Sequence, residues 1–280
     1  MNAPSRREGV TGNVDAMNAT APFGFVPIDA RRSAKPRRTG LSMVIDDGLP
    51  LPYVQGVLDI AAPYIDLMKI KTGTARLYPR QRLMEKLALY QSAGVRPFLG
   101  GQFHEYVFAT LGETALATFY DEARALGFDT IEISDNTVPL TDAQRRGQIA
   151  AAVASGLQVF GEVGSKETLS NPGLLVRQAE ICFNAGATLV LVEAAELVDN
   201  GVVRRDTLEI IKRELPLERI MIELPGPWIA GVRSCDIEDM KKIVLAEFGP
   251  DVNLANIGVT TIYDTEAQRV GLGTGGPLHG

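Results

Sequence analysis

The chain has 280 residues, of which 45% are hydrophobic and 22% are charged, an ordinary balance for a folded globular protein. Its net charge of −6 at pH 7 argues against broad binding to nucleic acid, which needs a basic surface. The sequence contains no apolar run long enough to span a bilayer and no signal-peptide core, so we expect a cytoplasmic protein with no membrane partner. Cys182 and Cys235 lie in helix-like stretches, and we expect both to be reduced packing residues.

Residues 1–40 differ in composition from the rest of the chain. They are rich in Arg, Ala, Pro and Asn, show no sustained periodicity, and carry a basic cluster from Arg31 to Arg38. Such a segment is typical of a flexible or surface-lying arm, and docking on a neighbouring subunit is the alternative. We therefore predict an N-terminal arm over 1–40, a folded domain over 41–271 and a Gly-rich tail over 272–280.

From residue 41 onward, short apolar runs alternate with segments of helical spacing. Strands are predicted over 41–45, 65–70, 95–99, 130–134, 157–163, 188–192, 219–222 and 252–257. Helices are predicted over 51–62, 77–92, 114–126, 143–155, 174–185, 204–215, 236–248 and 263–270. Strict alternation indicates a parallel sheet, and eight units close naturally into one (β/α)₈ TIM barrel of the α/β class. A doubly wound sheet is the alternative, but Asp46-Asp47-Gly48 after the first strand lacks its glycine fingerprint.

The stretch Thr-Ile-Glu-Ile-Ser-Asp over 130–135 shows how such a barrel would build a site. Glu132 and Ser134 share one face of the predicted strand, while Ile131 and Ile133 share the other. Asp135 follows the strand directly. In a parallel α/β barrel the carboxyl ends of the strands carry the reactive side chains, so we expect the active site there.

Several acids at the predicted strand ends are embedded in apolar runs, among them Glu162, Glu193 and Glu223. A carboxylate buried without a partner is costly, so each needs a cation, a hydrogen-bond donor or a metal. Acids that converge on one barrel mouth repel each other unless a cation joins them. Ligation by oxygen alone favours Mg²⁺ or Mn²⁺ over zinc.

The basic candidates are one histidine and two lysines. His104 is the only histidine in the folded body, either in a loop near the site or on the surface, which excludes a multi-histidine metal site. Lys69 lies inside a predicted strand and Lys166 follows a Glu-Val-Gly-Ser turn. A lysine at a barrel mouth can bind phosphate, donate a proton or form a Schiff base. For Lys69 the alternative is a salt bridge to an acid of a neighbouring strand.

Taken together, an ordered set of motifs from about Leu41 to Gly271 resembles the phosphosulfolactate synthase family, which adds sulfite to phosphoenolpyruvate in coenzyme M biosynthesis. The motifs are Asp46-x-Gly-Leu-Pro50, Tyr64-Ile-Asp66, Lys69-x-x-x-Gly73-Thr74, Gly100-Gly101, Phe103-x-Glu105, Glu132-Ile-Ser-Asp135, Glu162-Val-Gly164-x-Lys166, Gly186-Ala, Glu193, Glu223-x-Pro225 and Asn253-Leu-Ala-Asn-Ile257. The resemblance implies a (β/α)₈ barrel, dependence on Mg²⁺, a small anionic substrate and a homo-oligomer.

By this resemblance, sulfite attacks C3 of phosphoenolpyruvate, a divalent cation holds the resulting enediolate, and a lysine protonates C2. Lys166 is the implied proton donor, and Lys69 would contact an anionic group. The implied catalytic residues are Lys166, Lys69 and Glu132. The predicted substrate-binding residues are Asp46, Lys71, Gly101, Arg76, Asn253 and Asn256. The implied metal ligands are Asp135, Glu162, Glu193 and Glu223.

The sequence also departs from the family pattern at four places. The family has Lys where this chain has Asp47, and Phe-Gly-Trp-Gly-Thr-Ser where residues 70–75 read Ile-Lys-Thr-Gly-Thr-Ala. It has two lysines where this chain has Ser165-Lys166, and Arg-Gly-Leu-Arg-Gly-Asp-Thr where residues 270–275 read Val-Gly-Leu-Gly-Thr-Gly. Positive charge is lost, which Lys71 and Arg76 would restore in part. The alternatives are therefore a related barrel lyase for a less anionic enol or 2-oxo acid, and a non-catalytic, stress-associated homologue.

Overall fold

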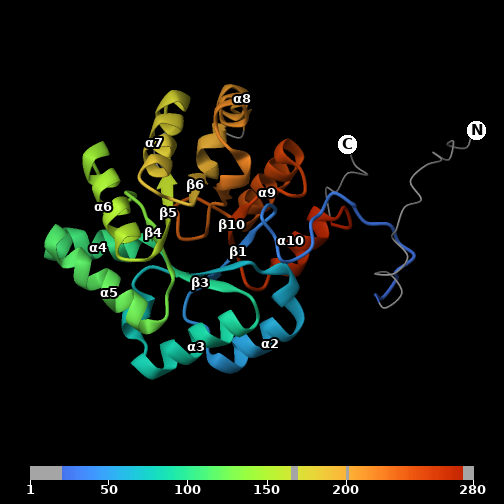
Figure 1. Cartoon of the computed structure of the whole chain (residues 1–280). Helices are drawn as coiled ribbons and strands as arrows, with labels where there is room; N and C mark the ends of the chain where they lie inside the picture. The colour runs from blue at the N-terminus through green and yellow to red at the C-terminus, as the bar shows by residue number, and fades with distance from the viewer. Residues whose placement is uncertain (1–20, 165–169, 200–201, 274–280) are drawn as a thin grey trace, which may run out of the picture.

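Eight parallel strands close into a barrel in the computed structural model, which describes residues 21–164, 170–199 and 202–273 (Figure 1). The strands are β1 (Ser42–Asp46), β2 (Leu67–Ile70), β3 (Arg96–Leu99), β4 (Thr130–Ile133), β5 (Gln158–Val163), β6 (Leu189–Glu193), β9 (Ile220–Glu223) and β10 (Leu254–Ile257). They follow one another around the ring in chain order, and β10 pairs with β1 to close it. The predicted TIM barrel is confirmed.

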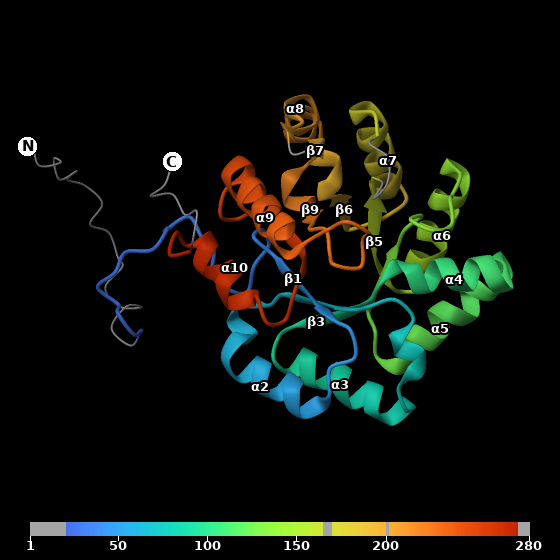
Figure 2. The ribbon, with the colours of Figure 1, turned by 180° about the vertical axis from the view of Figure 1, so that it is seen from behind.

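Helices surround the barrel on all sides (Figures 1 and 2). They are α2 (Leu51–Ala61), α3 (Arg80–Ser92), α4 (Gly101–Leu111), α5 (Leu116–Leu126), α6 (Asp142–Ala154), α7 (Pro172–Asn184), α8 (Arg205–Glu214), α9 (Ser234–Phe248) and α10 (Ile262–Arg269). Short 3₁₀ turns are η1 (Ala62–Tyr64), η2 (Thr74–Leu77), η3 (Glu113–Ala115), η4 (Ala194–Leu197) and η5 (Leu217–Arg219). Helix α4 and the hairpin β7 (Val198–Asp199)–β8 (Val202–Val203) were not predicted. In the described part of the chain, no helix is both long enough and apolar enough to cross a bilayer.

The barrel interior has an apolar floor beneath a charged layer. The floor is made by Met43, Leu67, Phe98, Phe160, Leu189, Leu191, Met221 and Ala255. Side chains two positions apart on a strand share a face, so the residue two places after a floor residue also points inward. On β2, β5, β6 and β9 that residue is charged: Lys69, Glu162, Glu193 and Glu223. The alternation of side chains along these four strands therefore places one cation and three acids inside the barrel, near its carboxyl end.

The described half of the N-terminal arm packs against its own barrel. The Arg32 guanidinium donates to Glu266 at 2.9 Å and to Asp251 at 3.1 Å. The Lys35 ammonium donates to the carbonyls of Ala62 and Ile65. The basic cluster of this described segment thus finds acids and carbonyls on the same chain. Residues 1–20 of the predicted arm and 274–280 of the predicted tail lie outside the described residues.

The two cysteines differ in burial. Cys182 of α7 is buried, as predicted. Cys235 is exposed in the first turn of α9, so its predicted packing role is wrong. The spacing of α9 buries Met240, Lys241 and Val244 instead, which leaves Cys235 on the solvent side.

Candidate active site

The charged layer opens into a cavity of about 480 Å³ at the carboxyl ends of the strands. Its walls come from the loops after β1, β2, β3, β4 and β9 together with inward-facing residues of the strands. The lining residues are Ile45, Asp47, Lys69, Lys71, Thr72, Thr74, Gly100, Gly101, Gln102, Glu132, Asn136, Glu162, Glu223, Trp228 and Asn256. The cavity therefore lies where active sites of this fold are found.

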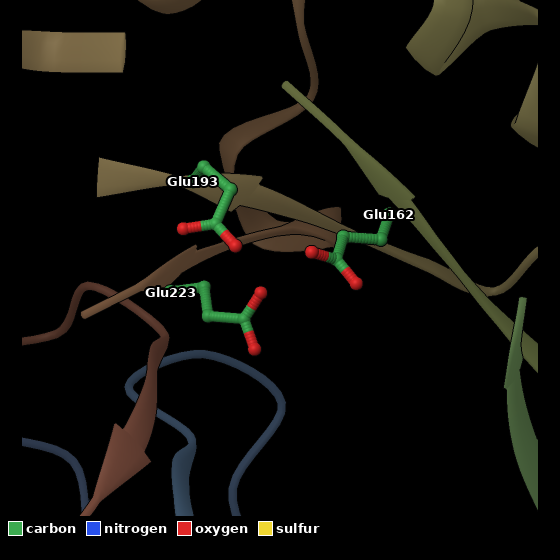
Figure 3. Close-up of side chains that lie close together, drawn as sticks. All are labelled: Glu162, Glu193 and Glu223. Carbon is green, nitrogen blue, oxygen red and sulfur yellow. The ribbon is translucent and has the colours of Figure 1, made fainter. Parts of the chain in front are cut away.

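Three buried glutamates converge beside this cavity (Figure 3). Glu162, Glu193 and Glu223 come from β5, β6 and β9, which are consecutive around the ring, and Glu193 pairs in register with Glu223. One carboxylate oxygen from each lies within 4.8 Å of the others. The Asn136 amide donates to Glu162 Oε1 at 2.7 Å, which orients that carboxylate. Three of the four predicted metal ligands are therefore brought together.

The fourth predicted ligand, Asp135, is directed elsewhere. Its carboxylate accepts from the buried Arg145 guanidinium at 2.5 Å, and Arg145 also donates to the carbonyl of Glu162 at 2.8 Å. Asp135 follows the end of β4, so it faces α6 instead of the barrel axis. Asp135 therefore forms an ion pair that joins the β4–α6 loop to β5, and it lies outside the cluster of three glutamates.

Lys69 links two acids across the mouth. Its ammonium lies 2.9 Å from Glu132 Oε2 and 2.9 Å from Glu223 Oε1. These acids belong to β4 and β9, neither of which adjoins β2, so the bridge spans the mouth instead of joining neighbouring strands. Burial disfavours the charged lysine, but Glu132, Glu223 and Glu162 outweigh it and hold the pKa of Lys69 well above its ordinary value. Lys69 is therefore a fixed cation, unsuited to form a Schiff base, which needs a neutral amine.

Glu132 is fixed from its other side by the turn that begins α4. The backbone N–H of Gly101 donates to Glu132 Oε1 at 3.0 Å. A side chain at position 101 would collide with this site, because an added Cβ would lie 2.2 Å from Ser134 Oγ. The Gly100-Gly101 turn thus lets backbone approach the carboxylate closely.

Asn256 also reaches the cavity, through a local irregularity in β10. Its φ of 60° lies in the left-handed region, and the register between β1 and β10 shifts at this point. The amide nitrogen donates to the carbonyl of Leu224 at 3.0 Å, while the buried amide oxygen has no hydrogen-bond partner among the described residues. Backbone strain of this kind is often found at functional sites. Asn256 therefore remains a candidate for binding substrate.

Asp46, predicted to bind substrate, is instead enclosed by protein. Lys86 and Tyr90 donate to Oδ2 at 2.6 and 2.8 Å, and the N–H groups of Gly48 and Leu49 donate to Oδ1. Its position at the end of β1 lets it fix the following loop. Asp46 therefore positions Asp47, which lines the cavity.

Two other predicted substrate-binding residues lie away from the mouth. Arg76 lines a separate outer cleft that also contains residues of α3 and α5. Asn253 precedes β10, where it accepts from Leu41 N–H and donates to the carbonyls of Glu218 and Ile220. It therefore lies at the opposite end of the barrel, because a residue before a parallel strand faces the amino-terminal side. Lys166 lies outside the described residues.

His104 occupies neither predicted position. It is buried on α4, and its Nε2 lies 3.0 Å from the Tyr120 hydroxyl of α5. Burial lowers the pKa of His104 to about 4, so the imidazole is neutral at neutral pH. It is a packing residue that joins α4 to α5.

Sequence reasoning missed Asn136 and Trp228 as cavity residues, and Glu105 as the organiser of the β4–α6 loop. Glu105 accepts from Ser134 Oγ, from the backbone and hydroxyl of Thr137 at 2.6 Å, and from Val138 N–H at 2.9 Å. Trp228 carried a signal, since it is the only tryptophan and follows the seventh predicted strand.

We expect Glu105→Gln to lower the free energy of unfolding at pH 7 by about 1.5–3 kcal/mol, the usual contribution of hydrogen bonds to a charged group. Burial opposes ionisation of Glu105, but hydrogen bonds from Ser134, Thr137 and Val138 outweigh it and lower its pKa. This contribution is complete above the ordinary glutamate pKa of about 4.3 and is lost as pH falls through the lower folded value. Urea unfolding between pH 7 and pH 3 should show the gap between variant and wild type closing; a constant gap would contradict this role.

Comparisons of the sequence with known proteins point to one enzyme family. A family model described as (2R)-phospho-3-sulfolactate synthase (ComA) matches residues 30–274. Phosphosulfolactate synthase of Methanothermobacter thermautotrophicus is 35% identical over 252 residues, which cover 86% of this chain and 92% of that protein. The Bacillus subtilis phosphosulfolactate synthase is 30% identical over 257 residues, covering 86% and 93%.

Two further similarities are more distant. The Arabidopsis thaliana protein HEAT-STRESS-ASSOCIATED 32 is 24% identical over 268 residues, covering 85% of this chain and 88% of that protein. The solved structure of the YdjI aldolase from Escherichia coli K12 superposes with a TM-score of 0.53 at 11% identity, covering 81% of this chain and 78% of the other. This second similarity shows the barrel fold alone.

Proposed function

Because the chain belongs to the phosphosulfolactate synthase (ComA) family and is an enzyme of this lyase-type class, we propose that it adds sulfite to phosphoenolpyruvate to give phosphosulfolactate. In this addition the sulfur lone pair forms the C3–S bond and the C2=C3 π electrons move to C2 and its carboxylate. A proton delivered to C2 completes the product. The enzyme therefore has to hold two anions together, stabilise new charge on the carboxylate and supply one proton.

The buried cluster Glu162–Glu193–Glu223 carries the proposal, because its donor set fits Mg²⁺. All three donors are carboxylate oxygens, the ligands that Mg²⁺ prefers, and they come from three consecutive strands. Their mutual repulsion also favours a divalent cation among them. A bound Mg²⁺ would supply positive charge to stabilise an enediolate formed from the substrate carboxylate.

The remaining tasks fall to side chains around the cavity. Lys69, held as a cation by Glu132 and Glu223, presents fixed positive charge to an anionic substrate. Glu132 and Gly101 keep that lysine in place, and Asn256 offers a buried amide oxygen. Lys166 stays our prediction for the proton donor, and a homo-oligomer and a cytoplasmic location also stay predictions.

One observation favours a second candidate, a related lyase for a less anionic enol or 2-oxo acid. Among the described residues that line the cavity, the cations are Lys69 and Lys71, whereas the acids are Asp47, Glu132, Glu162 and Glu223. Even with one divalent cation bound, the two lysines and four acids of this lining carry no net positive charge. A substrate without phosphate would suit such a cavity better.

The test is product formation by the purified enzyme from phosphoenolpyruvate and sulfite. With Mg²⁺ we expect a new phosphorus signal of phosphosulfolactate by ³¹P NMR, and chelation by EDTA should reduce the rate at least about 100-fold, with recovery when Mg²⁺ is restored. Parallel reactions replace phosphoenolpyruvate by pyruvate, with the C3–S product sulfolactate detected by ¹H NMR as the readout, because sulfite also adds spontaneously to the pyruvate carbonyl. Activity on pyruvate alone would support the second candidate, and Mg²⁺-independent turnover would contradict the metal assignment.

A further inference from the structure

A lysine and a tryptophan meet at the rim of the cavity. The Lys71 ammonium lies 3.8 Å from the centroid of the Trp228 ring, a cation–π contact. Both residues line the cavity, and 42% of Trp228 is exposed. Lys71 follows β2, whereas Trp228 belongs to the loop after β9, so the contact joins two loops across the mouth.

The backbone of Lys71 is held at both ends. Its N–H donates to the carbonyl of Asp46 at 3.0 Å, and its carbonyl accepts from Thr74 N–H at 3.2 Å and from Thr74 Oγ1 at 2.7 Å. Thr72 adopts a φ of 50°, in the left-handed region that a threonine rarely occupies. The turn thus fixes where the Lys71 side chain begins, and the ring limits where its ammonium goes.

Trp228 is held equally firmly. Its ring covers Gly226 so closely that an added Cβ there would lie 2.2 Å from ring atoms. Ile229 N–H closes the turn by donating to the carbonyl of Gly226 at 3.0 Å. The start of the loop is tied to the cavity by Asn256, which donates to the carbonyl of Leu224. The ring is therefore a preorganised wall.

We propose that Trp228 is a specificity-determining residue that holds the Lys71 ammonium in place to bind an oxyanion of the substrate, a carboxylate or a phosphate. The inference rests on the proposed function and deepens it. Among the described residues that line the cavity, Lys69 and Lys71 are the two cations, and Lys69 is placed deeper, between two carboxylates. An aromatic wall restricts a flexible lysine, which lowers the entropic cost of holding its ammonium against an anion.

The kinetic test compares Trp228→Leu and Trp228→Phe with wild type. We expect Trp228→Leu to raise KM for the organic substrate about 3- to 30-fold, the range of a cation–π contact, while kcat changes less than about twofold. Trp228→Phe should lie between the two. In a Lys71→Met background, Trp228→Leu should have little further effect, because both act through one contact. Tyr106→Leu, which removes an exposed aromatic from α4 outside the cavity, is the matched control.

Fluorescence of Trp228 gives a test that needs no turnover, since the chain has one tryptophan. Phosphoenolpyruvate should change its emission in the wild type and much less in Lys71→Met. A response to inorganic phosphate identifies a phosphate site, and a response to pyruvate identifies a carboxylate site. The inference is overturned if none of these three probes changes the emission, or if Trp228→Leu leaves KM unchanged. If the wild type did not add sulfite to phosphoenolpyruvate but its Trp228 emission still changed with a probe, the proposed function alone would be overturned.

Discussion

Glu193→Gln is expected to abolish Mg²⁺-dependent activity, with a loss of at least about 100-fold, beyond the 10- to 100-fold typical of residues that only support a ligand. The amide preserves the shape of the side chain but removes one of three charges that lie within 4.8 Å of each other. Calorimetric titration of Mg²⁺ should show a matching loss of affinity. Glu162→Gln and Glu223→Gln should lose Mg²⁺ affinity in the same way, because each removes one ligand charge, and Glu223→Gln also weakens the pair with Lys69.

Asp135→Asn tests whether Asp135 is a metal ligand, as the sequence predicted, or the ion-pair partner of Arg145, as in the structure. Asp135 pairs with Arg145, outside the glutamate cluster, so its variant should keep Mg²⁺ affinity within about threefold. Its stability should fall, because Arg145 is buried and loses its partner. Equal loss of Mg²⁺ affinity in Asp135→Asn and Glu193→Gln would show that the metal site extends to β4.

Lys69→Met is expected to reduce activity about 100- to 1000-fold, the usual effect of removing one preorganised charge from an active site. The methionine fills similar volume but leaves Glu132 and Glu223 buried without their shared cation. We also expect the free energy of unfolding to fall by about 3–5 kcal/mol, as for other broken buried ion pairs. Steady-state kinetics and urea unfolding on the same preparation measure the two effects.

Lys86→Met is the matched control for this loss. Lys86 is also buried and also holds an acid, Asp46, but it lies outside the cavity lining. We expect a similar loss of stability with an activity loss below about tenfold, because only the loop that carries Asp47 is disturbed. If both variants lost activity equally, Lys69 would be acting through stability and not through charge at the site.

The strands and their order could be predicted because each is a short apolar run bounded by polar or glycine residues. Glu162, Glu193 and Glu223 were predicted at the strand ends, and the period of two of the strands explains why their side chains point inward. Boundaries shifted by one or two residues: Glu193 and Glu223 end their strands instead of following them. The convergence of these three acids thus follows from the alternation of side chains along the strands and from the closure of the barrel.

Prediction was weakest where a residue's contacts depend on a partner that the sequence pattern does not identify. Asp135 looked like a ligand because the attraction of Arg145, ten positions later, has no sequence signature. Helix α4 was missed because Gly100-Gly101 is typical of a loop, whereas Glu105 and Val107 are buried by the folded chain. Asn253 shares a motif with Asn256, yet only the latter reaches the cavity, since the two lie at opposite ends of one strand.

The ion pair between Arg32 of the N-terminal arm and Glu266 of α10 bears on the order in which the chain folds. Arg32 bonds to Glu266, 234 positions later, and β1 finds one of its two neighbours only in β10. Contacts of such long sequence separation form late, because the intervening chain must first be brought together. During synthesis β1 therefore presents an open edge until the last strand has left the ribosome. We therefore expect ring closure and the contacts of the arm to be among the last steps of folding, with the edge of β1 open to aggregation before them.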